Sequence, residues 1–156
     1  MKNIVAAVLA FSCVNAFSAE SPLLENALSC KLKDNEMSSL MRELASRQPD
    51  FAKPAAQFGA PSADVYRLQK PVTAFGYSAS EVVVTPGRIL LAVPGEPVAR
   101  AIGKLKLTAE EYAPASRVVR PTVSVVAFQL SHQPLQNKLL VGCEYANADA
   151  AAWVKQ

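Results

Sequence analysis

Apolar residues in the N-terminal part of the chain recur at the spacing of one helix face. The residues at positions 37, 40, 41 and 44 follow this period, in a segment that Asp34 can cap and that Pro49 ends. A shorter helix is expected just before it, with Ser21 as its cap and Pro22 in its first position. The pattern therefore predicts two N-terminal helices that bury their apolar faces in a core.

After these helices the helical period is lost. The stretch 49–63 contains three prolines and five alanines, so we expect a loop that Phe51 and Phe58 attach to the core. Two strand-like runs follow at 64–69 and 72–78. Pro71 lies between them, which suits an edge or a break more than a central strand.

Two hairpins are predicted in the rest of the chain. The first covers residues 81–93 and turns at Pro86–Gly87, and the second joins strands at 122–132 and 138–145. Between the hairpins, residues 97–105 place their apolar side chains on one face of a short helix. The tail is expected to form a helical turn from which Trp153 packs back on the core.

The order of these elements is two helices, four strands, one helix and two strands. This order predicts an α+β fold: an antiparallel β-sheet of about five to six strands with the N-terminal helices and one mid-chain helix packed on it. About half of the 156 residues are apolar, and a chain of this length buries enough surface for one core. We therefore expect a single domain over residues 20–156.

The first 19 residues have the pattern of a secretory signal peptide. Lys2 precedes an apolar run that is too short to span a membrane, and small residues follow the run. We expect cleavage near Ala19, with Ala16 as the alternative site. A buried first helix is a weaker interpretation because the run has no polar face, and lipid attachment at Cys13 is disfavoured by the bulky Phe11 before it. The predicted location is the periplasm or the exterior of the cell.

Removal of this leader leaves two cysteines, Cys30 and Cys143, and an even number in an exported chain predicts a disulfide. In the predicted strand 138–145, Cys143 shares its face with large apolar residues and should point into the core. A redox-active pair is the alternative, but the two cysteines lack the close Cys-x-x-Cys spacing that tunes a reactive thiolate. The sequence therefore predicts one structural disulfide.

The charged residues indicate no nucleic-acid partner. The formal net charge is +3, and the Lys and Arg residues are scattered singly, apart from the pairs Lys31/Lys33 and Lys104/Lys106. Nucleic-acid-binding proteins usually concentrate these residues on one face of a recognisable module. No run after the leader is long and apolar enough for a transmembrane segment, and we expect the mature chain to be a monomer.

Catalytic motifs are not evident, so we expect a protein that is not an enzyme, with no catalytic residue, cofactor or metal site. The single histidine, His132, lies at a hairpin entrance, and Ser78 lies in GYSAS, which lacks the final glycine of a nucleophile elbow. Glu110 and Glu111 are adjacent, whereas an acid–base pair faces across a cleft. An envelope hydrolase that uses Glu110 or Glu111 is therefore the third and weakest hypothesis.

Protein–protein binding, of the kind seen in inhibitors and immunity proteins, is the leading hypothesis. The candidate partner-binding residues are Tyr77, Arg88, Arg117 and Arg120, because tyrosine and arginine often anchor interfaces, and Lys138 could extend a basic rim. The expected partner is an unknown envelope or secreted protein. The second hypothesis is a carrier of a small ligand or lipid, since the central strands have apolar residues on both faces, more than a one-sided sheet needs.

Overall fold

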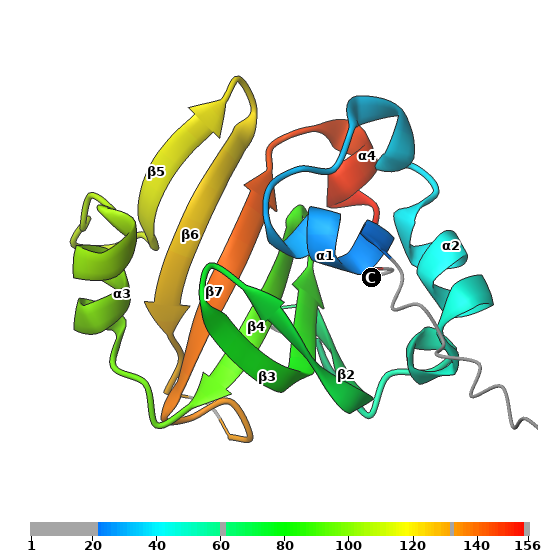
Figure 1. Ribbon diagram of the computed structural model, residues 1–156, viewed down its shortest axis with the longest axis horizontal. Coiled ribbons are helices and arrows are strands. Elements are labelled where there is room, and N and C mark those ends of the chain that lie inside the picture. Colours follow the sequence, from blue (N-terminus) through cyan, green and yellow to red (C-terminus); the bar gives the residue numbers. More distant parts are fainter. Residues whose placement is uncertain (1–21, 60–61, 132, 155–156) are drawn as a thin grey trace, which may run out of the picture.

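The computed structural model describes residues 22–59, 62–131 and 133–154 (Figure 1). The predicted signal peptide, its cleavage sites at Ala16 and Ala19, and Cys13 lie outside the described residues, as does His132. Within the described part of the chain, no helix is long and apolar enough to cross a membrane.

A single antiparallel sheet of seven strands forms the centre of the fold, in the order β1-β2-β3-β4-β7-β6-β5. The predicted α+β class is confirmed, but the predicted count of five to six strands is wrong. The strands are β1 (Ala56–Gly59), β2 (Ser62–Ala74), β3 (Tyr77–Thr85), β4 (Arg88–Pro94), β5 (Ala115–Arg120), β6 (Val123–Gln129) and β7 (Lys138–Tyr145).

The two unpredicted strands, β1 and β5, are the edges of the sheet. β1 is only four residues long and lies inside the Pro- and Ala-rich stretch predicted as a loop, so its short alternation was not a usable signal. Half of the side chains of β5 are exposed, and this strand lacks the apolar alternation of a half-buried strand. A further difference concerns Pro71, which does not interrupt β2. Instead, the strand pairing shifts register between Arg67 and Val72, and the chain turns at Phe75–Gly76, where both residues have positive φ angles.

The helices lie close to the predicted positions, with one interruption. The predicted helix from Asp34 begins as a separate 3₁₀ turn, and the α-helix starts only after Ser39. The backbone N–H of Lys33 donates to the Glu36 carboxylate at 2.8 Å, which stabilises the first turn. The helices are α1 (Pro22–Leu28), α2 (Leu40–Arg47), α3 (Val98–Leu105) and α4 (Ala148–Ala151), with 3₁₀ turns η1 (Asp34–Glu36) and η2 (Pro49–Phe51).

The four α-helices of the described residues all contribute to one apolar core on the same face of the sheet. Figure 1 shows α1, α2 and α4 grouped on one side, with α3 beside β5 and β6. The predicted disulfide is confirmed: Cys30, just after α1, is bonded to Cys143 in β7, and their Cα atoms lie 5.3 Å apart. Both cysteines are buried, which agrees with a structural role.

The C-terminal residues attach the helices to the last strand. The hydroxyl of Tyr145 donates to the Ala27 carbonyl at 2.7 Å, and the indole N–H of Trp153 donates to the Met37 carbonyl at 2.7 Å. The two aromatic rings meet edge to face with centroids 5.5 Å apart. Trp153 therefore packs on the core as predicted, and it connects α4 to the segment before α2.

Candidate binding groove

The face of the sheet opposite the helices carries a second apolar cluster. Its buried members come from strands, apart from Leu135 in the loop before β7, and no residue of the helices that the structure describes belongs to it. The apolar surplus on both faces of the central strands thus has two causes, because one face packs on helices and the other supports this cluster. The buried members are Ala63, Val65, Val83, Leu90, Ala92, Val126, Leu135 and Leu140.

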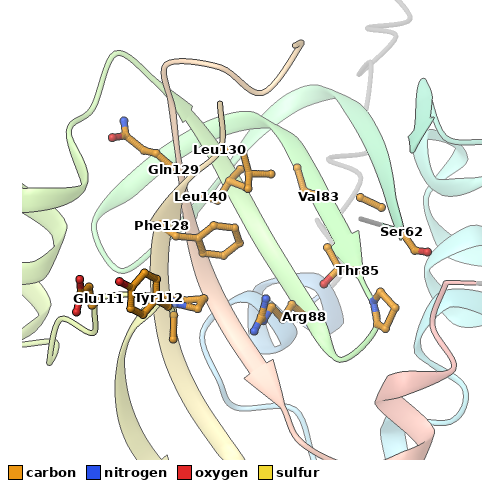
Figure 2. Close-up of a pocket in the computed structure, with 14 residues that line it drawn as sticks. Ser62, Val83, Thr85, Arg88, Glu111, Tyr112, Phe128, Gln129, Leu130 and Leu140 are labelled. Carbon is orange, nitrogen blue, oxygen red and sulfur yellow. The ribbon is translucent and has the colours of Figure 1, made fainter. Parts of the chain in front are cut away.

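A groove of about 730 Å³ lies on this second face. Figure 2 shows Ser62 at one side and the linker with Glu111 and Tyr112 at the other, with Val83, Thr85 and Phe128 between them. The groove therefore crosses the sheet from β2 to the segment that precedes β5. Its lining is mainly apolar: Ala63, Val83, Pro86, Ala113, Pro114, Phe128, Leu130 and Leu140 contribute, beside Ser62, Thr85, Arg88, Glu111, Tyr112 and Gln129.

Arg88 is the cationic residue of the groove lining. Its Nε donates to the Glu144 carboxylate, and its guanidinium lies 5.7 Å from the centroid of the Phe128 ring. The two contacts fix the arginine at the start of β4. Within the described residues its two terminal nitrogens have no hydrogen-bond partner, so Arg88 can donate to an incoming acceptor without losing Glu144.

A second ion pair lies on the same face, toward the other end of the strands. Lys138 of β7 reaches across β4 to Glu81 of β3, and both side chains are largely buried. The second oxygen of Glu81 is buried without a hydrogen-bond partner in the described part of the chain. This pair closes the apolar cluster at one end, whereas the end at Arg88 opens into the groove.

The groove wall near β5 is formed by the linker 111–114. Tyr112, in this linker, is 94% exposed and is the most exposed large apolar side chain of the described residues. A tyrosine offers a large contact area at low cost in conformational entropy, so the exposed Tyr112 has the properties of an interface anchor. It was not among the predicted partner-binding residues.

The predicted partner-binding residues occupy three separate places. Arg88 lines the groove, and Arg117 and Arg120 lie on β5. Tyr77 is buried beneath Lys104, whose ammonium lies 3.9 Å from the ring centroid. Burial raises the pKa of Tyr77, and its hydroxyl has no hydrogen-bond partner among the described residues. Tyr77 thus attaches α3 to the sheet and presents little surface to a partner.

Arg88 was among the predicted partner-binding residues, whereas Phe128 and Tyr112, which also line the groove, were not. In the sequence, Phe128 is one of several apolar positions in a predicted strand. Its neighbours in sequence do not indicate that it faces the open side of the sheet. Tyr112 lies between the predicted helix at 97–105 and the second predicted hairpin, outside every predicted strand. The adjacent glutamate and proline residues gave no sign that this linker folds over the sheet.

Six residues of the groove lining have polar side chains: Ser62, Thr85, Arg88, Glu111, Tyr112 and Gln129. The lining contains one carboxylate, Glu111, whereas general acid–base hydrolysis of the glycosidase type needs two. Among the described residues, no three His, Cys, Asp or Glu side chains come together in a way that could hold a metal ion. The lining offers apolar surface, hydroxyl groups, the amide of Gln129, the carboxylate of Glu111 and the guanidinium of Arg88.

Comparison of the chain with family models, with curated proteins and with solved structures found no match. The geometry of the groove and its surroundings is therefore the basis for the proposed function. A fold of this class would not decide the function in any case, because the same architecture supports many activities.

Proposed function

We propose that this chain is an exported, non-enzymatic binding protein that recognises a partner protein through the groove. The observation that carries this proposal is an apolar groove of about 730 Å³ on the face of the sheet that no described helix covers, with exposed Tyr112 on its wall. Export is proposed because the leader sequence and the buried disulfide agree with an oxidising compartment.

The partner is expected to insert an apolar side chain and to place a carboxylate beside it. The floor residues Val83, Leu140 and Phe128 favour an apolar group, since each Å² of apolar surface buried contributes about 25 cal/mol. Arg88 retains unpaired donors beside this floor, and a guanidinium binds carboxylates with strong, directed hydrogen bonds. The combination fits an apolar residue next to Asp or Glu in the partner.

Site-specific photo-crosslinking in the native host tests the proposal. A photoreactive phenylalanine analogue at Tyr112 should give a discrete crosslinked species, whereas the same analogue at Arg42 should give none. Arg42 is a matched control because it is exposed but lies on α2, which covers the other face. The Thr85→Trp change should fill the groove and abolish the crosslink, while Thr85→Ser should retain it. Equal crosslinking from positions 112 and 42 would contradict the proposal.

A small apolar ligand is the second candidate, and the volume of the groove favours it. Pockets for small molecules usually measure about 300–1,000 Å³ and are lined mainly by apolar side chains. The hydrophobic fluorophore phenylnaphthylamine is a suitable probe, since its emission rises in an apolar site. Saturable binding that Thr85→Trp removes and Thr85→Ser retains would support this candidate. A protein that gives no emission change and no co-purified small molecule by native mass spectrometry would exclude it.

A further inference from the structure

The two edges of the sheet differ in their exposure. β1 has four residues, and a short edge strand offers little to pair with. β5 has six residues and carries Val118, 70% exposed, and Val119, 46% exposed. With Tyr112, three residues before β5, these are the large apolar side chains that are exposed in the described part of the chain. Exposed apolar surface is therefore concentrated at one edge.

The backbone of β5 has hydrogen-bonding groups that face away from β6. The N–H and C=O of Ser116 point outward, because they bond to Thr108 at 2.9 and 2.8 Å. The regular pairing of β5 with β6 continues from Ser116 to Val118, and the register shifts only between Val118 and Arg120. Backbone groups alternate in direction along a regular antiparallel strand, so we infer that the N–H and C=O of Val118 also point outward. The sheet order places no described strand beyond β5, and the bridge to Thr108 involves Ser116 alone. Val118 thus offers one donor and one acceptor.

The arginines of β5 do not block this edge. Natural edge strands are commonly protected by charged side chains that project from them. Here the Nε of Arg117 donates to the Leu105 carbonyl at 3.0 Å, and Arg120 bonds to the Leu32 carbonyl and, at 2.9 Å, to Asp34. These contacts turn both side chains toward the helical side. The terminal nitrogens of Arg117 have no partner among the described residues and can bind a carboxylate.

We propose that an extended, acidic segment of the partner protein adds to the sheet along the outer edge of β5. The segment forms backbone hydrogen bonds with Val118, places an apolar side chain beside Val118 on the groove face, and places Asp or Glu beside Arg117 on the other face. This inference rests on the proposed function, since the groove wall 111–114 leads directly into β5 and one partner can contact both (Figure 1).

A second copy of the chain fits this edge less well. Pairing of two β5 strands would bring the arginines of both copies together, and like charges repel. The unpaired part of β5 is also short, since Thr108 occupies the position at Ser116. A stable interface buries roughly 800 Å² on each partner, which so short a strand pairing does not supply by itself. The groove supplies the additional contact area when the occupant is a partner segment.

The test uses a fluorescently labelled peptide of alternating valine and glutamate, measured by fluorescence anisotropy. Val118→Pro removes the outward N–H and should weaken binding at least tenfold. Proline is tolerated at an edge position whose N–H faces solvent, so the variant should fold. Val118→Thr, which keeps the N–H, is the matched control and should bind within twofold of the original protein. Trp153 fluorescence verifies the fold of both variants.

Two modified peptides and one exchange measurement complete the experiment. N-methylation of the edge-facing residues, or replacement of glutamate by lysine, should reduce binding at least tenfold. Hydrogen exchange should show protection of the Val118 amide when the peptide is bound. Equal binding of the methylated and unmethylated peptides, equal binding to Val118→Pro, or no peptide binding would each overturn strand addition. Dimerisation that Val118→Pro abolishes would overturn it too, because a second copy would then occupy the edge.

Failure of this inference can be separated from failure of the proposed function. Crosslinks at Tyr112 that persist unchanged in the Val118→Pro variant leave the groove function standing and overturn strand addition. Peptide binding that depends on the Val118 N–H, without any crosslink at Tyr112, supports strand addition and contradicts the role of the groove.

Discussion

Removal of the Cys30–Cys143 disulfide is expected to cause a large loss of stability. The bond joins α1 to β7 and spans 113 residues of sequence. Without the bond, the unfolded chain gains conformational freedom, while the folded chain retains its core. Cys30→Ala with Cys143→Ala is the direct perturbation.

The expected loss of stability can be calculated from the entropy of loop closure in the unfolded chain. For a loop of this length, the chain-entropy relation gives about 5 kcal/mol at room temperature. A domain of this size is usually stable by about 5–15 kcal/mol, so the loss is a large fraction of the total. A second variant tests the contribution of the backbone at Cys30. This residue has a φ angle of 62°, a conformation that costs a non-glycine residue about 1–2 kcal/mol. Cys30→Gly with Cys143→Ala should therefore be about 1 kcal/mol more stable than the double alanine variant.

Equilibrium unfolding in urea, followed by Trp153 fluorescence, measures both differences. The chain has one tryptophan, which is buried and bonded to the Met37 carbonyl, so its emission reports on the folded state. A double alanine variant within about 1 kcal/mol of the original protein would refute the reasoning. A glycine variant less stable than the alanine variant would refute the assigned role of the backbone at Cys30.

Three further predictions concern stability. Gly142→Ala should cost about 3 kcal/mol or more, because a Cβ there would lie 2.2 Å from a backbone carbonyl oxygen of β4. Gly103→Ala is the control, with open space around it, and should stabilise α3 slightly in the same urea assay. Phe51→Ala should cost about 3–5 kcal/mol, since it removes a buried ring stacked on Tyr66, and a loss below 1 kcal/mol would show that η2 is not needed to hold the core. Burial raises the pKa of Tyr145, and burial together with Asp64 raises the pKa of Tyr66 to about 12. Above pH ~10 the unfolded chain loses phenolic protons that the folded chain keeps, so the free energy of unfolding should fall by up to about 1.4 kcal/mol per pH unit for each tyrosine. Tyr145→Phe should make this decrease less steep. An unchanged slope would contradict the raised pKa of Tyr145.

Several features of the fold could be predicted because their signals are local. The hairpin turn at Pro86–Gly87 depends on the conformations that proline and glycine favour, and it lies where the sequence places it. The disulfide was predicted from the number of cysteines that lie after the predicted leader. The helix period at positions 40 and 44 correctly indicated the buried face of α2, although the first turn is a separate 3₁₀ turn. The turn and helix signals depend on residues that are close in sequence, and two cysteines can pair in only one way.

The edges and the groove were decided by the tertiary structure. The sequence by itself determined that the central strands are apolar on both faces, but not that helices would gather on one face and leave the other to Leu135 and the linker 111–114. It marked Tyr77 and Arg88 as equal candidates, yet the first is buried beneath Lys104 and the second lines the groove. The reason is physical: exposure and pairing belong to the neighbours that a residue meets only after the chain has folded, and those neighbours are distant in sequence.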